Sequence, residues 1–226
     1  VISPVSLIIS AFAPVYDVRK SLTPELRTDA GETCLLLIDL ARGKQRLGGS
    51  IFAQVTGQIG KEAPDVEDAQ TLKAFFAAIQ TLNQEGALLA YHDKSDGGLF
   101  ATVCEMAFAG RTGVYLNIDM LTIDPHASDW GDFKIRPEQV QVQRSELTRN
   151  ALFNEELGGV VQIRKKDLAA VMQVLRAAGL GAYIHVIGAP TATGKIEIYR
   201  DAKNIFSAMR AQLQQEWSKV SFSIQK

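Results

Sequence analysis

Several features that mark specialised proteins are missing from this chain of 226 residues. Lys and Arg number 24 against 25 Asp and Glu, so the net charge is −1. This balance excludes the strongly basic surface by which proteins bind nucleic acid. No apolar run approaches the roughly 18–20 residues that span a bilayer, so no membrane segment is expected. Neither a Gly-x-Gly-x-x-Gly motif nor a Walker-type loop is present, which excludes two common nucleotide-binding signatures.

Cysteine is nearly absent. Cys34 and Cys104 lie in unrelated apolar segments, and no Cys-x-x-Cys occurs. This usage excludes a zinc or redox motif and predicts two buried structural thiols. It is also typical of a reducing compartment, which we take to be the cytoplasm.

What the chain does contain is the composition of a globular protein with a core, since 46% of its residues are hydrophobic and 22% are charged. Its length suits one large domain or two small ones. It begins at Val1 in an apolar stretch, without an initiator Met. This start suggests a piece of a longer protein, and composition alone leaves the number of domains open.

Hydrophobic periodicity predicts an α/β fold with a mixed sheet flanked by helices. The expected strands are 3–13, 34–40, 87–91, 114–118, 159–164, 182–188 and 195–199. The expected helices are 66–85, 99–109, 151–157, 166–178 and 203–217. Strand, helix and strand follow one another twice, which favours α/β layers. Residues 119–150 are polar and contain two prolines, so they predict a long insertion or lid-like loop.

One segment carries chemistry, the tight stretch YHDKSDGG at residues 91–98, between a buried strand and a helix. Open α/β sheets usually bind ligands at such strand ends. Asp93 and Asp96 supply carboxylates and Ser95 supplies a hydroxyl. Gly97 and Gly98 let the backbone approach an anion closely, and the N-terminus of the following helix attracts negative charge. These groups suit a Mg²⁺–phosphate site, in which Mg²⁺ takes one or two carboxylates.

A plainer interpretation remains open at this point, and the two are compatible. Ser95 or Asp96 could cap the helix, and the glycines could serve only the turn. His92 beside Asp93 invites a hydrolase interpretation, but no Gly-x-Ser-x-Gly elbow exists and Cys104 lies inside a predicted helix. His185 falls within a predicted strand and His126 within a polar loop.

The segment AYHDKSDGGLFATVCEMAFAG (Ala90–Gly110) resembles the phosphoribosylformylglycinamidine synthase family, or FGAR amidotransferases, of purine biosynthesis. Three further segments resemble it in the same order: SPVSLIISAFAPVYDVRKSLTPELRTD (3–29), LLLIDLARGKQRLGGSIFAQV (35–55) and LFNEELGGVVQIR (152–164). The large bacterial form is the nearest in pattern. Residues 1–226 look like a single C-type domain, of the aminoimidazole-ribonucleotide (AIR) synthetase class, from the second half of the synthetase core, and so like a fragment of a larger multidomain enzyme. The stretch 111–150 is longer than in the family, which indicates an insertion at about 119–150.

The resemblance implies a fold and a function that composition alone does not give. The fold would be a mixed sheet flanked by helices, like the AIR synthetase C-terminal domain. The family converts formylglycinamide ribonucleotide (FGAR) to its amidine, using ATP and glutamine. Its motif aspartate, here Asp93, contributes to a Mg²⁺ site, and its motif serine, here Ser95, contacts a bound ATP or ADP.

The remaining Mg²⁺ ligands would lie in a neighbouring ATP-binding N-type domain, and the ammonia source in a glutaminase domain. These sister domains, with FGAR as substrate, are the expected partners, and the isolated chain is expected to be inactive. Two alternatives are a non-catalytic assembly or nucleotide-stabilising module, and a domain of a related AIR synthetase or selenophosphate synthetase.

Overall fold

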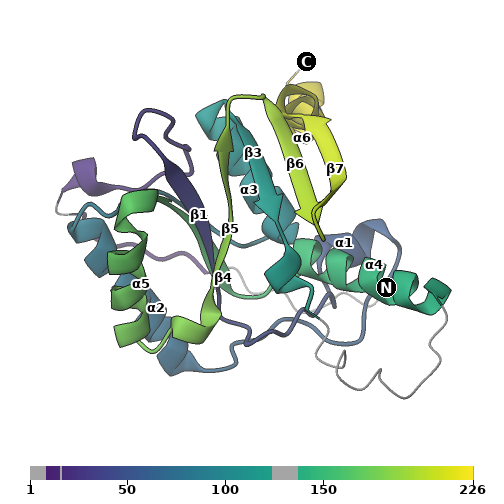
Figure 1. Cartoon of the computed structure of the whole chain (residues 1–226), viewed down its shortest axis with the longest axis horizontal. Coiled ribbons are helices and arrows are strands. Elements are labelled where there is room, and N and C mark those ends of the chain that lie inside the picture. Colours follow the sequence, from purple (N-terminus) through teal and green to yellow (C-terminus); the bar gives the residue numbers. More distant parts are fainter. Residues whose placement is uncertain (1–8, 16, 124–136, 226) are drawn as a thin grey trace.

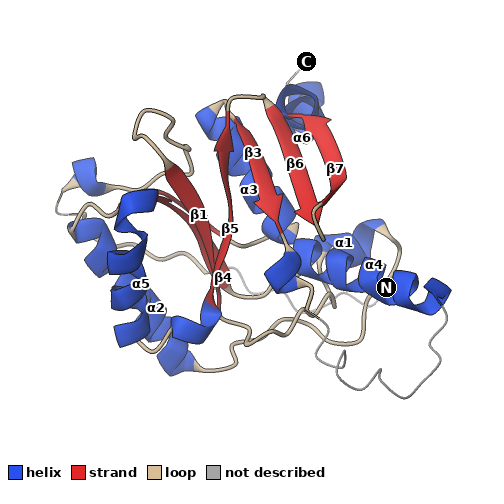
Figure 2. Ribbon diagram, in the orientation of Figure 1, coloured by secondary structure: helices blue, strands red, loops and turns tan. Residues whose placement is uncertain are grey.

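The computed structural model describes residues 9–15, 17–123 and 137–225 and shows one seven-stranded sheet with helices on both faces (Figures 1 and 2). The strands are β1 (Thr33–Asp39), β2 (Leu88–Asp93), β3 (Gly113–Asn117), β4 (Gly158–Arg164), β5 (Ile184–Thr191), β6 (Lys195–Arg200) and β7 (Lys203–Met209). The α-helices are α1 (Ile51–Val55), α2 (Ala69–Gln84), α3 (Gly98–Gly110), α4 (Pro137–Phe153), α5 (Leu168–Ala177) and α6 (Arg210–Ile224).

The sheet is mixed, as predicted. Its strand order is β2-β4-β1-β5-β3-β6-β7. The β3–β6 pair is parallel, and the other neighbouring pairs are antiparallel. Because β1 and β2 both run antiparallel to β4, their carboxyl ends lie at the same edge of the sheet.

Two hydrophobic cores lie on opposite faces of the sheet. Strand β1 divides its side chains between them: Leu36 and Ile38 pack with α2 and α5, whereas Leu35 and Leu37 pack with α3. A strand buried on both faces has a continuous apolar sequence, which explains the run CLLLID in β1. Within the ranges that the structure describes, no helix is both long and apolar enough to cross a bilayer.

The predicted N-terminal strand at 3–13 is wrong where it can be judged. Residues 1–8 lie outside the described part of the chain, and residues 9–13 form no regular structure. Phe12 is 96% exposed and Ile9 is 77% exposed. β-branched and aromatic residues favour a strand only where a sheet edge pairs with them, and these residues are not paired with the sheet.

Three further sequence expectations fail toward the C-terminal end. Helix α4 starts at Pro137, so much of the expected 119–150 loop is helical, and the short helix expected at 151–157 is only the end of α4. Residues 124–136 lie outside the described ranges. The helix expected at 203–217 is instead strand β7 followed by α6. In β7, Phe206 packs toward the core while Ile205 is exposed, an alternation that antiparallel pairing with β6 makes possible.

Gly188 allows β5 to pass closely beside β3. Its φ is +156°, and a Cβ there would lie 1.9 Å from the carbonyl oxygen of Tyr115. We expect Gly188→Ala to lower the free energy of unfolding by about 2–5 kcal/mol, because both backbone strain and overpacking oppose it. Urea denaturation of the chain measures this loss.

Gly179→Ala is the matched control. Gly179 also has a positive φ, +79°, but nothing lies within 4 Å of its Cβ position. Its substitution should cost only about 1 kcal/mol, the backbone part alone. Equal losses for the two variants would contradict the close approach at Gly188.

Candidate functional site

Two aspartates end β1 and β2, which run in the same direction on either side of β4, at one edge of the sheet. In the register of β4, Asp39 of β1 lies opposite Gly158, and Asp93 of β2 lies opposite Gly159. The segment 91–98 therefore reaches the sheet edge beside the end of β1. This is the edge at which the sequence predicts a ligand site.

Asp93 and Ser95, the two residues predicted to hold metal and nucleotide, are both exposed on the same turn. The Tyr91 hydroxyl donates a hydrogen bond to Asp93 Oδ1. Burial, and then the hydrogen bond to Asp93, raise the pKa of Tyr91 above its ordinary value, so it remains a donor. Asp93 also lines a cleft of about 900 Å³ between residues 17–22 and α2.

Two carboxylates, Asp93 and Asp96, are exposed on this turn with the Ser95 hydroxyl, and one carboxylate with the hydroxyl fits one side of a Mg²⁺–nucleotide site. Mg²⁺ in such sites is held by one or two carboxylates, with water and phosphate oxygens completing the shell. Among the described residues, no group of three or more His, Cys, Asp or Glu could hold a metal ion by itself. The donors present could therefore contribute to a shared site, with Asp93 on the metal and Ser95 on the nucleotide.

The start of α3 is capped by neither of the two side chains that the sequence offers, although Gly97 and Gly98 do form the turn, both with positive φ. Its N-cap is Gly97, at φ +81°, and neither Ser95 nor Asp96 caps the helix by its side chain. The Gly97 N–H instead donates to Glu155 Oε1 at 2.8 Å, and the Ile51 N–H at the start of α1 donates to the same oxygen at 2.8 Å. The carboxylate of Glu155 thus sits where a phosphate could have bound the helix N-terminus.

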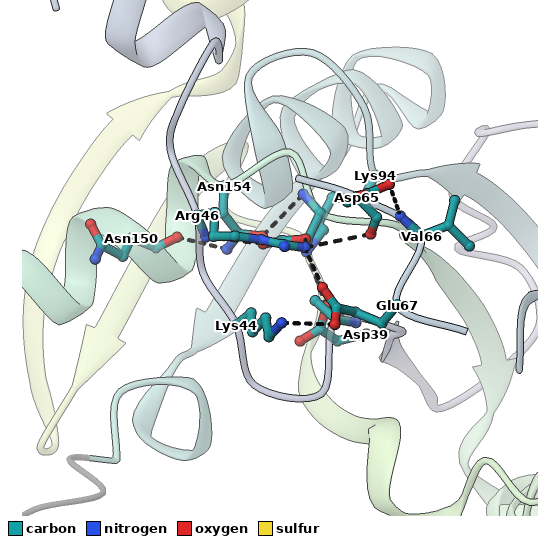
Figure 3. Close-up of polar contacts among 11 residues, drawn as sticks. Asp39, Lys44, Arg46, Asp65, Val66, Glu67, Lys94, Asn150 and Asn154 are labelled. Carbon is teal, nitrogen blue, oxygen red and sulfur yellow. Dashed lines mark hydrogen bonds and ion pairs between the residues drawn. The ribbon is translucent and has the colours of Figure 1, made fainter. Parts of the chain in front are cut away.

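Lys94 points inward between the two exposed residues of the turn. Its side chain is 2% exposed, and its Nζ donates to Asn154 Oδ1 at 2.7 Å and lies 3.3 Å from Asp39 Oδ1 (Figure 3). Burial lowers the pKa of Lys94, while the nearby carboxylates of Asp39 and Glu156 act in the opposite direction. The lysine joins the ends of β1 and α4 to the turn after β2.

Glu156 holds the loop that follows β1. Its side chain is fully buried, and its two oxygens accept from Arg46 Nε at 2.6 Å and Arg46 Nη2 at 2.8 Å. Arg46 also pairs with Glu67 at 2.8 Å, and Lys44 donates to Glu67 at 2.7 Å (Figure 3). The carboxylate of Glu156 raises the pKa of Arg46, so the guanidinium stays charged.

His92 faces away from Asp93, toward α3. Its Nε2 lies 2.9 Å from Glu105 Oε2, and Trp217 Nε1 of α6 donates to Glu105 Oε1 at 2.9 Å. His92 therefore links α3 and α6 to β2 and is not part of the exposed turn. His185 lies in β5, as predicted, and His126 lies outside the described residues.

Both cysteines are buried free thiols, as predicted. Burial raises the pKa of Cys104 to about 12 and also raises that of Cys34. A thiol with a raised pKa is a poor nucleophile at neutral pH, which agrees with a structural role.

Sequence reasoning missed the charged residues that support the turn, namely Asp39, Arg46, Lys94, Glu155 and Glu156. The signal for Lys94 was its position, since residues at i and i+2 of an extended segment face one way and the residue between them faces the other. The signal for Glu155 and Glu156 was a pair of carboxylates directly before a buried strand. Neither pattern identifies its partner, because the partners are 55 to 110 residues away in the sequence.

Adjacent glutamates should respond differently to the same substitution. Glu156→Gln leaves the Arg46 guanidinium with one carboxylate fewer in a buried setting, and we expect it to lower the free energy of unfolding by about 3 kcal/mol. Glu155→Gln keeps an amide oxygen as acceptor for the two backbone N–H groups and loses only the charge, at about 1 kcal/mol. Urea denaturation compares them, and a larger loss for Glu155→Gln would contradict this assignment.

Comparison with solved structures supports the fold. PurL from Thermotoga maritima complexed with FGAR is 14% identical, with a TM-score of 0.62 over 87% of this chain and 30% of that chain. Phosphoribosylformylglycinamidine synthase II from Thermotoga maritima is 12% identical, with a TM-score of 0.60 over 87% of this chain and 28% of that chain. PurL from Thermotoga maritima complexed with ATP is 12% identical, with a TM-score of 0.59 over 87% and 27%. This chain therefore spans less than a third of the length of these proteins.

Residues 32–201 match the family described as AIR synthase related protein, C-terminal domain. The match contains the strands β1 to β6, the turn at 91–98 and the buried charges that support it. The chain belongs to the AIR synthase related protein family, as its C-terminal domain.

Proposed function

We propose that this chain is one domain of an ATP-dependent, glutamine-using amidine synthase that converts FGAR to formylglycinamidine ribonucleotide in purine biosynthesis, in the cytoplasm. In this reaction ATP activates the formamide oxygen as an iminophosphate, and ammonia from glutamine displaces phosphate. Membership of the AIR synthase related family supports the ATP-using class. The four ordered segments that resemble FGAR amidotransferases support the substrate.

Within that enzyme, Asp93 would bind Mg²⁺ and Ser95 would contact the bound adenine nucleotide. The observation that carries this part is the exposure of both side chains on one turn at the carboxyl ends of β1 and β2. Tyr91 orients the Asp93 carboxylate through its hydroxyl. Bound Mg²⁺ would neutralise charge on phosphate oxygens, and PurL structures complexed with ATP and with ADP support a nucleotide as its companion.

The sister domains would supply what this chain does not contain. An N-type ATP-binding domain would provide the remaining Mg²⁺ ligands, and a glutaminase domain would provide ammonia. The chain's length relative to the PurL structures supports such a multidomain parent.

A second candidate is a nucleotide-stabilising role without catalysis. It is favoured by the small number of ligands on the turn, because one carboxylate beside one hydroxyl can anchor a bound nucleotide without acting on it. In that case Asp93 and Ser95 would stabilise the assembled enzyme. Related AIR synthetase and selenophosphate synthetase enzymes remain alternative parents within the same family.

Asp93→Asn in the full-length protein should loosen the Mg²⁺–nucleotide, because an amide is a much weaker Mg²⁺ ligand than a carboxylate. We expect ADP affinity in the presence of Mg²⁺ to fall about 10- to 100-fold, measured by isothermal titration calorimetry after removal of bound nucleotide. Asp96→Asn is the matched control, since Asp96 is exposed on the same turn, and it should retain the affinity. Equal affinities for Asp93→Asn and wild type would remove Asp93 from the site.

The isolated 226-residue chain should not turn over FGAR. With ATP, Mg²⁺ and ammonia supplied, amidine formation followed by chromatography should stay at the background rate, while the full-length protein is active. The reason is that one domain provides too few ligands to hold ATP and FGAR together. Measurable amidine formation by the chain alone would show that it contains a complete active site.

A further inference from the structure

We propose that Lys94 is a positioning residue, whose buried ammonium fixes the outward direction of Asp93 and Ser95. This inference rests on the proposed function for its effect on nucleotide binding. The positional part rests only on contacts within the chain.

The first step is the alternation of side chains along the turn. Asp93, Lys94 and Ser95 are exposed, buried and exposed in sequence. In extended backbone, consecutive side chains point to opposite sides. Any rotation that moved Asp93 or Ser95 inward would therefore turn the Lys94 side chain out of its buried position.

The second step is the set of contacts that holds Lys94 in place. Its Nζ reaches Asn154 Oδ1 at 2.7 Å and Asp39 Oδ1 at 3.3 Å. Its backbone N–H donates to the carbonyl oxygen of Gly158 at 2.9 Å. The residue is thus attached to the end of β1, to the segment after α4 and to the start of β4.

The third step is the cost of changing this arrangement. A buried charge is tolerated when it is paired and hydrogen-bonded, and removing one member of such a pair leaves the other uncompensated. The Asp39 side chain is 12% exposed and lies beside the ammonium. Movement of the turn would separate this pair, so the pair restrains the turn.

The experiment removes Lys94 without leaving an unpaired buried charge. Lys94→Met alone leaves Asp39 unpaired and could unfold the protein. The double variant Asp39→Asn/Lys94→Met removes both charges, an exchange that is often neutral in stability. Asp39→Asn alone keeps Lys94 and its hydrogen bond to Asn154 but leaves the ammonium without its carboxylate, so it tests the loss of the charge pair separately from the loss of the lysine.

Two readouts are taken in the full-length protein. Each variant and the wild type are measured at the same number of degrees below their own melting temperature. Hydrogen exchange by mass spectrometry reports peptides that cover residues 91–98, and calorimetry reports ADP affinity in the presence of Mg²⁺. In the double variant we expect exchange at the turn to rise at least about tenfold, and ADP affinity to fall about 10- to 100-fold. Exchange in α2 and α5 should stay unchanged, which a general loss of stability would not allow.

Each outcome decides the proposal. Faster exchange confined to the turn with weaker ADP binding supports the positioning role. Faster exchange with unchanged ADP affinity also supports the positioning role, and it contradicts the proposed nucleotide site at Asp93 and Ser95. Unchanged exchange at residues 91–98 in the folded double variant would overturn it.

Discussion

Two buried charges at one edge of the sheet, the Lys94 ammonium and the Glu156 carboxylate, constrain the rest of this structure. Each is expensive to bury unless partners surround it, and the partners come from separate parts of the chain. Lys94 requires Asp39 at the end of β1 and Asn154 after α4. Glu156 requires Arg46 in the loop after β1. The loops at this edge are therefore positioned by charge pairing, whereas the sheet itself is held by its two apolar cores.

The segment between α4 and β4 is the common point of these contacts. Asn154, Glu155 and Glu156 are consecutive, yet each side chain serves a different element. Asn154 accepts from Lys94, Glu155 accepts from the starts of α1 and α3, and Glu156 accepts from Arg46. Since all three follow one helix and precede one strand, a shift of this segment would move the turn after β2, helix α1 and the Arg46 loop together. The buried contacts of these three residues therefore position the turn that carries Asp93 and Ser95.

The sequence predicts the periodic parts of the fold and the place of the site, because both depend on local pattern. β1 is recognisable from its continuous apolar run, α2 from its stripe and α5 from its amphipathic spacing. Helix α4 is largely polar and offers no apolar stripe, so its composition resembles that of a loop. β7 contains Ile205 and Met209 at helical spacing, and only pairing with β6 makes it a strand. Asp93 and Ser95 lie in a recognisable motif, but Lys94 gains its role from Asp39 and Asn154, which no local pattern connects.

The Glu155 carboxylate at the N-terminus of α3 limits how this domain could contact a nucleotide. A helix N-terminus at the end of a strand is the usual cradle for phosphate, but here the Gly97 N–H is already bonded to Glu155. Under the proposed function, the contact with phosphate would then pass through a metal held by Asp93, and Ser95 would meet another part of the nucleotide. A carboxylate cannot neutralise phosphate charge, so in the proposed enzyme Mg²⁺ and ligands from a neighbouring domain would do so. Under the proposed function, a site divided between domains would thus follow from the side chain that occupies the helix N-terminus.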